Sequence, residues 1–245
     1  MRPLIVVLFI VAGCSANTPP SAPYSIPTGT AAAEEPVDGT PAKPTPEPEP
    51  RVEPTVVAQG FTANSEVDSA SYAVVIENPN STWWPRFVNV RITFLDAYGT
   101  ALTTETQNIT GILPESETAV AGEALEAGGA TTMEVEVSSL NLLPNRIRSS
   151  LGDTGRYDYE RVETARDESG EIKTTGLVVS RFGSEQINVP IAVVYYDAAG
   201  KVVGGAITHV DQLPPGGRAT FEASTSVTLL DVAETRVFGQ IGFGS

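Results

Sequence analysis

The sequence contains very few of the residues on which disulfide, metal and nucleic-acid chemistry depend. Its 245 residues include one Cys and one His, so an internal disulfide and the usual zinc sites are excluded. Only 15 residues are Lys or Arg against 30 Asp or Glu, which gives a formal net charge of −15. Nucleic-acid binding needs a basic surface, which this composition does not supply. We therefore expect no metal, no cofactor and no nucleic-acid partner.

Long hydrophobic runs are also missing. The one apolar run, Leu4–Ala12, is too short for a transmembrane helix, which needs about 20 residues. With Arg2 before it and small residues after it, the run is typical of a secretory signal. Val11-Ala12-Gly13-Cys14 resembles a bacterial lipobox. The resemblance implies removal of residues 1–13 and acylation of Cys14, which then anchors the chain to membrane lipid on the extracytoplasmic face. The alternative is an ordinary signal peptide with an incidental Cys.

Residues 14–55 are predicted to be a disordered Pro-rich linker. Residues 15–54 hold 11 of the 19 prolines, and their apolar residues are few and isolated. Such a segment buries too little surface to offset the entropy of folding. Prolines at this density favour an extended chain of about 3.1 Å per residue. The linker is either a spacer that holds the folded part away from the membrane or a tail without a selected length.

From residue 56 onward the composition favours β-strands. Val, Ile, Thr and aromatic residues increase, and turn residues bound the segments that they form. Long amphipathic helical patterns are missing, and Ala119–Ala127 could form at most one or two turns of helix. The predicted strands are Tyr72–Glu77, Val88–Leu95, Thr131–Val137, Tyr157–Thr164, Thr175–Ser180, Ile191–Tyr196, Arg218–Ala223 and Arg236–Ile241. The predicted fold is all-β.

Three blocks of sequence occur twice in the same order, which indicates two tandem copies of one β unit. Residues 88–99 align with 189–200, residues 125–134 with 213–222, and residues 139–143 with 226–230. The spacing from Gly99 to Gly128 is 29, against 16 from Gly200 to Gly216. This difference predicts an extra loop of 13 residues within 100–127 of the first copy.

Both copies of the first block combine period-two alternation with the same turn. Val90, Ile92 and Phe94 alternate with Arg91, Thr93 and Leu95, which places one row toward a core. The block then ends in Asp-x-x-Gly, at 96–99 and again at 197–200. Asp at the first position accepts backbone N–H bonds, and Gly tolerates a left-handed conformation. Both segments are predicted hairpin turns.

The two copies resemble the FxLYD domain. The resemblance rests on Ile92-Thr93-Phe94-Leu95-Asp96 and Val193-Val194-Tyr195-Tyr196-Asp197, each followed by a Leu-x-x-Gly-Gly segment that leads into a strand. It covers residues 56–150 and 156–243. It implies two tandem Ig-like β-sandwich domains, of a type common on prokaryotic secreted proteins and lipoproteins, and it implies no catalytic residues.

Candidate site residues outside the repeat are few. His209, the one His, is expected on a solvent-facing strand edge, and no Gly-x-Ser-x-Gly elbow accompanies it. Trp83 and Trp84 are adjacent and follow a turn-rich stretch, so they must point in different directions. An exposed Trp is a candidate anchor for a protein or carbohydrate partner. The alternative is that one Trp plugs the open end of the sandwich and the other covers nearby backbone.

Together these patterns predict a membrane-anchored lipoprotein that presents two β-sandwich modules. We expect it to bind a protein or an envelope polymer without catalysis. Two alternatives stay open: an accessory or structural subunit of an envelope complex, and an envelope hydrolase that uses a carboxylate pair. With 30 acidic residues, a close pair is expected by chance. The sequence does not decide the ligand or the oligomeric state.

Overall fold

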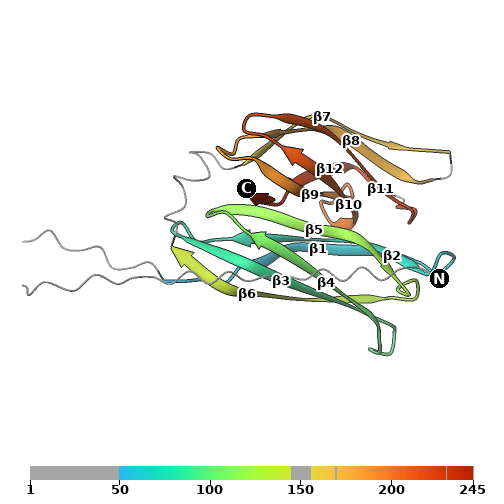
Figure 1. The fold of residues 1–245 in the computed structure, drawn as a ribbon. Coiled ribbons are helices and arrows are strands. Elements are labelled where there is room, and N and C mark those ends of the chain that lie inside the picture. Colours follow the sequence, from blue (N-terminus) through green and yellow to red (C-terminus); the bar gives the residue numbers. More distant parts are fainter. Residues whose placement is uncertain (1–49, 145–155, 169, 230, 245) are drawn as a thin grey trace, which may run out of the picture. The chain divides into compact units, whose positions relative to one another are not determined.

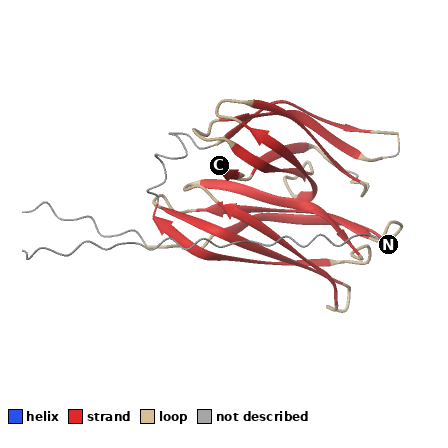
Figure 2. Ribbon diagram, viewed as in Figure 1, coloured by secondary structure: helices blue, strands red, loops and turns tan. Residues whose placement is uncertain are grey.

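The computed structural model describes residues 50–144 and 156–244, apart from 169 and 230. Throughout these residues the fold is all-β, as predicted, and contains strands and loops only (Figure 2). It follows that the described part of the chain holds no helix long and apolar enough to cross a membrane. Cys14, the signal segment 1–13 and the linker up to residue 49 lie outside the described residues.

The first sandwich consists of two three-stranded antiparallel sheets, β1-β2-β5 and β4-β3-β6 (Figure 1). Alternate apolar side chains of the two sheets, among them Ile76, Val90 and Ile92, meet in its core. The strands are β1 (Thr55–Asn64), β2 (Ser69–Asn78), β3 (Trp83–Leu95), β4 (Ala101–Gly111), β5 (Ser116–Leu125) and β6 (Thr132–Pro144).

The second sandwich repeats this plan with the sheets β7-β8-β11 and β10-β9-β12. A short strand, β13 (Phe243–Gly244), adds to the second sheet by pairing with β9. Its core includes Ile191, Val193 and Tyr195, the residues that the period-two pattern places on one face. The strands are β7 (Tyr157–Arg166), β8 (Ile172–Ser180), β9 (Gln186–Tyr196), β10 (Val202–Leu213), β11 (Arg218–Thr225) and β12 (Glu234–Gly239).

All eight strands expected from the sequence are present, and four long strands were missed. The predicted helical turns at Ala119–Ala127 are wrong, because Ser116–Leu125 forms strand β5. Strand β4 has the sequence ALTTETQNITG, whose apolar positions are too few to reveal a strand. It lies at a sheet edge and buries only two of its 11 residues, so polar residues suffice there.

The predicted extra loop in the first copy does not exist, because its residues form β4 and β5. Strand β6 follows the first Gly-Gly and pairs with β3, whereas β11 follows the second and pairs with β8. The two Leu-x-x-Gly-Gly segments therefore precede strands that are not equivalent. By pairing, β5 corresponds to β11 and β6 corresponds to β12. The Leu-x-x-Gly-Gly motif therefore aligns β6 with β11, which is wrong. The alignment of residues 88–99 with 189–200 is correct, because it equates β3 with β9.

The two sandwiches belong to one compact unit and pack through the sheets β1-β2-β5 and β10-β9-β12. Small side chains bring the sheets together: Ala73, Ala119 and Ala121 are fully buried against the second sandwich. The Ser71 hydroxyl donates to the Gly205 carbonyl oxygen (2.8 Å) and accepts the Gly205 N–H (3.0 Å). β5 is therefore covered on both faces, which explains why its Ala-rich sequence lacks a strand-like alternation.

Both predicted hairpin turns are confirmed. The Asp96 carboxylate accepts the N–H groups of Tyr98 and Thr100, both at 2.8 Å, and Gly99 has a φ of 79°. Asp197 accepts the N–H groups of Ala199 and Lys201, both at 2.9 Å, with Gly200 at 78°. Because the carboxylates are used inside the turns, Asp96 and Asp197 serve the fold.

Candidate binding face

The N-terminal segment meets the first sandwich at Val52. The Asn80 side chain accepts the Val52 N–H (2.9 Å) and donates to the Val52 carbonyl oxygen (2.6 Å). Asn80 is itself 2% exposed and donates a further hydrogen bond to the Asn78 side chain at 2.7 Å. This end of the sandwich, where the segment enters and where β3 begins, is called the proximal end below.

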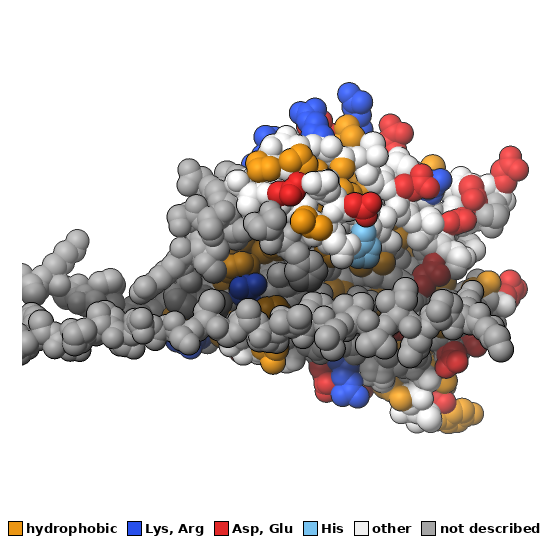
Figure 3. Space-filling view, viewed as in Figure 1, with side chains coloured by type: hydrophobic (Ala, Val, Ile, Leu, Met, Phe, Trp, Pro, Cys, Tyr) orange, Lys and Arg blue, Asp and Glu red, His pale blue; other side chains and the backbone are white. Residues whose placement is uncertain are grey.

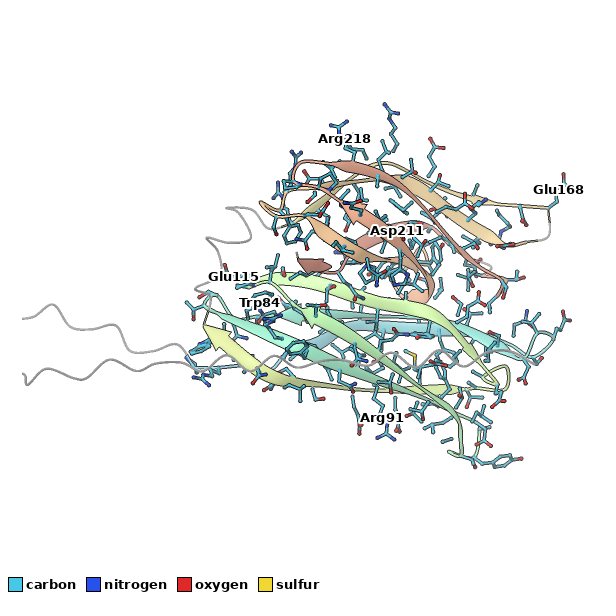
Figure 4. All side chains as sticks on the ribbon, in the orientation of Figure 1. Trp84, Arg91, Glu115, Glu168, Asp211 and Arg218 are labelled. Atoms are coloured by element: carbon cyan, nitrogen blue, oxygen red, sulfur yellow. The ribbon has the colours of Figure 1, made fainter. Side chains whose placement is uncertain are left out.

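Trp84 lies inside the proximal end and is 4% exposed. Its indole clusters with Phe182 and Ile241 of the second sandwich and covers Gly111, where an added Cβ would lie 2.3 Å from Nε1. Figure 4 shows the labelled Trp84 at this end of the first sandwich. Trp84 therefore plugs the open end of the sandwich, which is the structural alternative that the sequence left open for one of the two Trp residues. It offers no surface to a partner.

Trp83 is partly exposed at the start of β3. The Arg51 guanidinium lies 4.1 Å from the centroid of its ring, a cation–π distance. Of the two Trp residues predicted to mark a binding site, only Trp83 presents surface.

Phe87 is the most unusual residue near Trp83. It is 48% exposed and has a φ of 52°, a left-handed conformation that costs an L-residue about 1–2 kcal/mol. The equivalent position in the second copy is Asn188, with a φ of 50°. Asn tolerates this conformation far better than Phe. The first copy therefore holds an aromatic ring at the surface at a cost to stability, and such strained positions concentrate at functional sites.

In the β3–β6 pair Arg86 lies opposite Asn141 and Val88 opposite Ser139, which brings Leu140 beside Phe87; Leu140 is 77% exposed. Alternation in β6 points Met133, Val135 and Val137 into the core, so Leu140 belongs to the outer row. Arg86 places its guanidinium 5.0 Å from the Phe87 ring. We call Trp83, Phe87 and Leu140 the proximal strip. It is an apolar surface next to two Arg residues, Arg51 and Arg86, on an otherwise acidic protein.

Phe87 and Leu140 are not among the residues predicted to bind, although the sequence holds a signal for each. Phe87 immediately precedes the block 88–99, and Asn188 immediately precedes the matching block 189–200. The two residues therefore align with each other although they are chemically unlike. Leu140 interrupts the polar outer row Glu134, Glu136 and Ser138. The alignment of residues 139–143 with 226–230 pairs Leu140 with Val227, which is fully buried, so that misaligned block conceals the exposure of Leu140.

Phe87→Asn is expected to leave the free energy of unfolding unchanged or to raise it by up to about 1 kcal/mol, as measured by urea denaturation. Relief of left-handed strain at Phe87 outweighs the loss of its contact with Arg86, worth about 0.5–1 kcal/mol at an exposed site. The reverse change, Asn188→Phe, should lower stability by about 1–2 kcal/mol. A loss above 1 kcal/mol in Phe87→Asn would instead make Phe87 a structural residue.

The titratable groups with perturbed pKa values near the cores are tyrosines. Burial raises the pKa of Tyr72 to about 12, although Gln107 donates a hydrogen bond to its hydroxyl at 3.0 Å. Burial likewise raises the pKa of Tyr157 and Tyr159. These groups stay protonated at physiological pH. His209 is exposed on the edge strand β10, as expected. Among the described residues, no three His, Cys, Asp or Glu side chains are grouped to hold a metal ion.

Two clefts lie where the sandwiches meet. One of about 160 Å³ is at the proximal end, between the β4–β5 turn and β7 and β12, with Tyr157 and Phe182 in its wall. The Thr118 hydroxyl in this wall is buried without a hydrogen-bond partner among the described residues. The other, about 640 Å³, is at the opposite end and is lined by Glu66, Asp197 and Asp231.

Comparisons with known proteins identify no family. No family model matches the chain, and no curated protein matches it. Among solved structures, the exo-chitosanase CsxA of Amycolatopsis orientalis is similar at 16% identity with a TM-score of 0.28, over 76% of this chain and 26% of that chain. The chain thus spans about a quarter of that enzyme. The CBM22-1–CBM22-2 tandem domain of Paenibacillus barcinonensis Xyn10C is similar at 10% identity with a TM-score of 0.17, over 80% and 92% of the two chains. Similarities at this level indicate neither an activity nor a ligand.

Proposed function

We propose that the protein is a bacterial lipoprotein, anchored through acylated Cys14 to the extracytoplasmic face of the cell membrane, that binds a protein or envelope component without catalysis. In this proposal its two β-sandwiches are FxLYD-like modules, and the spacer is the Pro-rich linker predicted over residues 14–55, which ends where β1 begins at Thr55. The observation that carries the binding role is Phe87. A strained aromatic residue is kept at the surface, in line with Leu140 and Trp83, where the second copy has Asn188.

The proximal strip has the composition of a binding site. Aromatic residues supply much of the energy of protein interfaces, and exposed apolar side chains that are grouped mark contact sites. The adjacent Arg residues can donate hydrogen bonds to carboxylate or hydroxyl oxygens of a partner. These features support contact with another molecule.

Cys14→Ser is expected to move the protein from the membrane fraction to the soluble fraction of lysed cells. A thioether-linked diacylglyceryl group anchors stably because each buried methylene contributes about 0.8 kcal/mol, and Ser cannot carry that thioether. The measurement is immunoblotting of both fractions. Ser15→Ala, beside the Cys, is the matched control and should stay in the membrane fraction. A Cys14→Ser protein that remains membrane-bound in high salt contradicts the lipid anchor.

A further inference from the structure

Exposed apolar side chains also lie at the distal end of the first sandwich, opposite the point where the N-terminal segment enters. Val52 and Thr55 are at the proximal end, and β1 runs ten residues from there to Asn64, which is about 30 Å in a strand. Three turns meet at the distal end. The Glu126 N–H donates to the Asp68 carbonyl oxygen (2.9 Å), and the Thr131 N–H donates to that of Leu95 (2.9 Å).

Four apolar side chains stand out from these turns and the adjoining strand ends. Their exposed fractions are 93% for Tyr98, 69% for Leu125, 51% for Val67 and 36% for Leu102. We call these four residues the distal patch. Tyr98 is almost fully exposed, so its ring makes little contact with the rest of the sandwich.

The fold does not need the Tyr98 ring. Only the Tyr98 backbone N–H takes part in the turn, as a donor to Asp96. The equivalent turn in the second copy has Ala199 at this position and the same hydrogen bonds and Gly conformation. Ala is enough for this turn, yet the first copy has Tyr. A Tyr side chain presents about 150 Å² or more of amphipathic surface, which is the kind of surface that anchors protein interfaces.

Charge indicates what the distal patch fits. The three turns, residues 64–68, 96–101 and 126–131, contain Glu66, Asp68, Asp96 and Glu126 and no Lys or Arg. Figure 3 shows acidic side chains on the right of the view, on both sandwiches. A membrane with anionic lipids would be repelled. Charge opposes a second copy as well, because the formal net charge of −15 becomes −16 once Arg2 leaves with residues 1–13.

We propose that the distal patch docks a partner protein whose surface has an apolar socket for Tyr98 rimmed by Lys or Arg. This inference rests on the proposed binding function but uses a surface separate from the proximal strip. An acidic rim steers a basic partner toward the patch and makes the contact sensitive to salt.

Site-specific photocrosslinking in intact cells tests the proposal. A benzophenone amino acid replaces Tyr98 in the full-length, lipidated protein, and the matched control carries it at Ala199. We expect one protein adduct from position 98 and none from position 199. Glu66→Lys together with Glu126→Lys should reduce that adduct at least ten-fold. Glu134→Lys with Asp211→Lys, which changes the net charge equally elsewhere, should leave it unchanged.

Four results would overturn the proposal: no adduct at position 98, equal adducts at 98 and 199, an adduct with a second copy or a non-protein polymer, and an adduct that survives the Glu66 and Glu126 changes. Placing the photoreactive residue at Phe87 separates the two claims. An adduct from position 87 without one from 98 refutes the distal inference alone. The proposed binding function itself fails if neither position gives an adduct.

Discussion

Trp84→Ala should lower the free energy of unfolding by about 3–5 kcal/mol in urea denaturation. The Trp84 indole is 4% exposed, covers Gly111 and packs against Phe182 and Ile241, so its removal leaves a cavity at the proximal end of the first sandwich. The change would also weaken a contact between the two sandwiches, because Phe182 and Ile241 belong to the second.

Two controls make this result specific. Trp84→Phe should cost no more than about 2 kcal/mol, because a ring still fills the site and the Trp84 Nε1 proton has no hydrogen-bond partner among the described residues. Trp83→Ala should cost about 1 kcal/mol or less, since Trp83 is partly exposed and its cation–π contact with Arg51 is of the kind worth about 0.5–1 kcal/mol at an exposed site. Equal losses in Trp83→Ala and Trp84→Ala would contradict the assignment of Trp84 as the plug.

Gly205→Ala is expected to loosen the two sandwiches from each other and to cost about 1–3 kcal/mol. An added Cβ would lie 2.6 Å from the Val193 carbonyl oxygen, 2.7 Å from the Ala121 Cβ and 2.9 Å from the Ala73 Cβ. The Val193 oxygen belongs to β9, the neighbouring strand of the same sheet, whereas Ala121 and Ala73 are short, rigid side chains of the facing sheet, so the two sheets must move apart. Calorimetry should show one unfolding transition in the unaltered protein and two, or one at lower temperature, in the variant.

Gly129→Ala is the matched control, because the nearest atom to its added Cβ, Leu102 Cδ1, is 3.9 Å away. This variant should unfold in one transition with the stability of the unaltered protein. If Gly205→Ala behaved in the same way, the tight packing of Ala73, Ala121 and Gly205 would not be what joins the sandwiches.

The sequence predicted the fold class because the residues that build each core alternate clearly. Ile191, Val193 and Tyr195 face inward as period two requires, and the Asp turns at 96 and 197 have the expected hydrogen bonds. Strand β5 was missed because contact on both faces favours Ala and Gly, which hide the alternation. The packing between sandwiches depends on tertiary contacts that no local pattern encodes.

The candidate site was predictable only in part. The two adjacent Trp residues predict that one of them can be exposed at 83–84, but they do not predict which one. Strand geometry decides this, because β3 turns Trp84 inward and leaves Trp83 at the surface. Phe87 became visible through its backbone conformation, which sequence alone does not report. Leu140 was concealed by the misaligned Gly-Gly segments, and only the pairing of β6 with β3 places it beside Phe87.

The central claim is that the proximal strip binds an envelope partner, and one binding measurement tests it directly. The full-length Cys14→Ser protein, labelled with a fluorophore, is titrated onto envelopes from cells that lack the native protein. We predict saturable binding that Phe87→Asn weakens at least ten-fold without loss of stability, while Asn89→Ser on the same outer face has no effect. Binding that does not saturate, or that is equal for the unaltered protein and Phe87→Asn, would contradict the account.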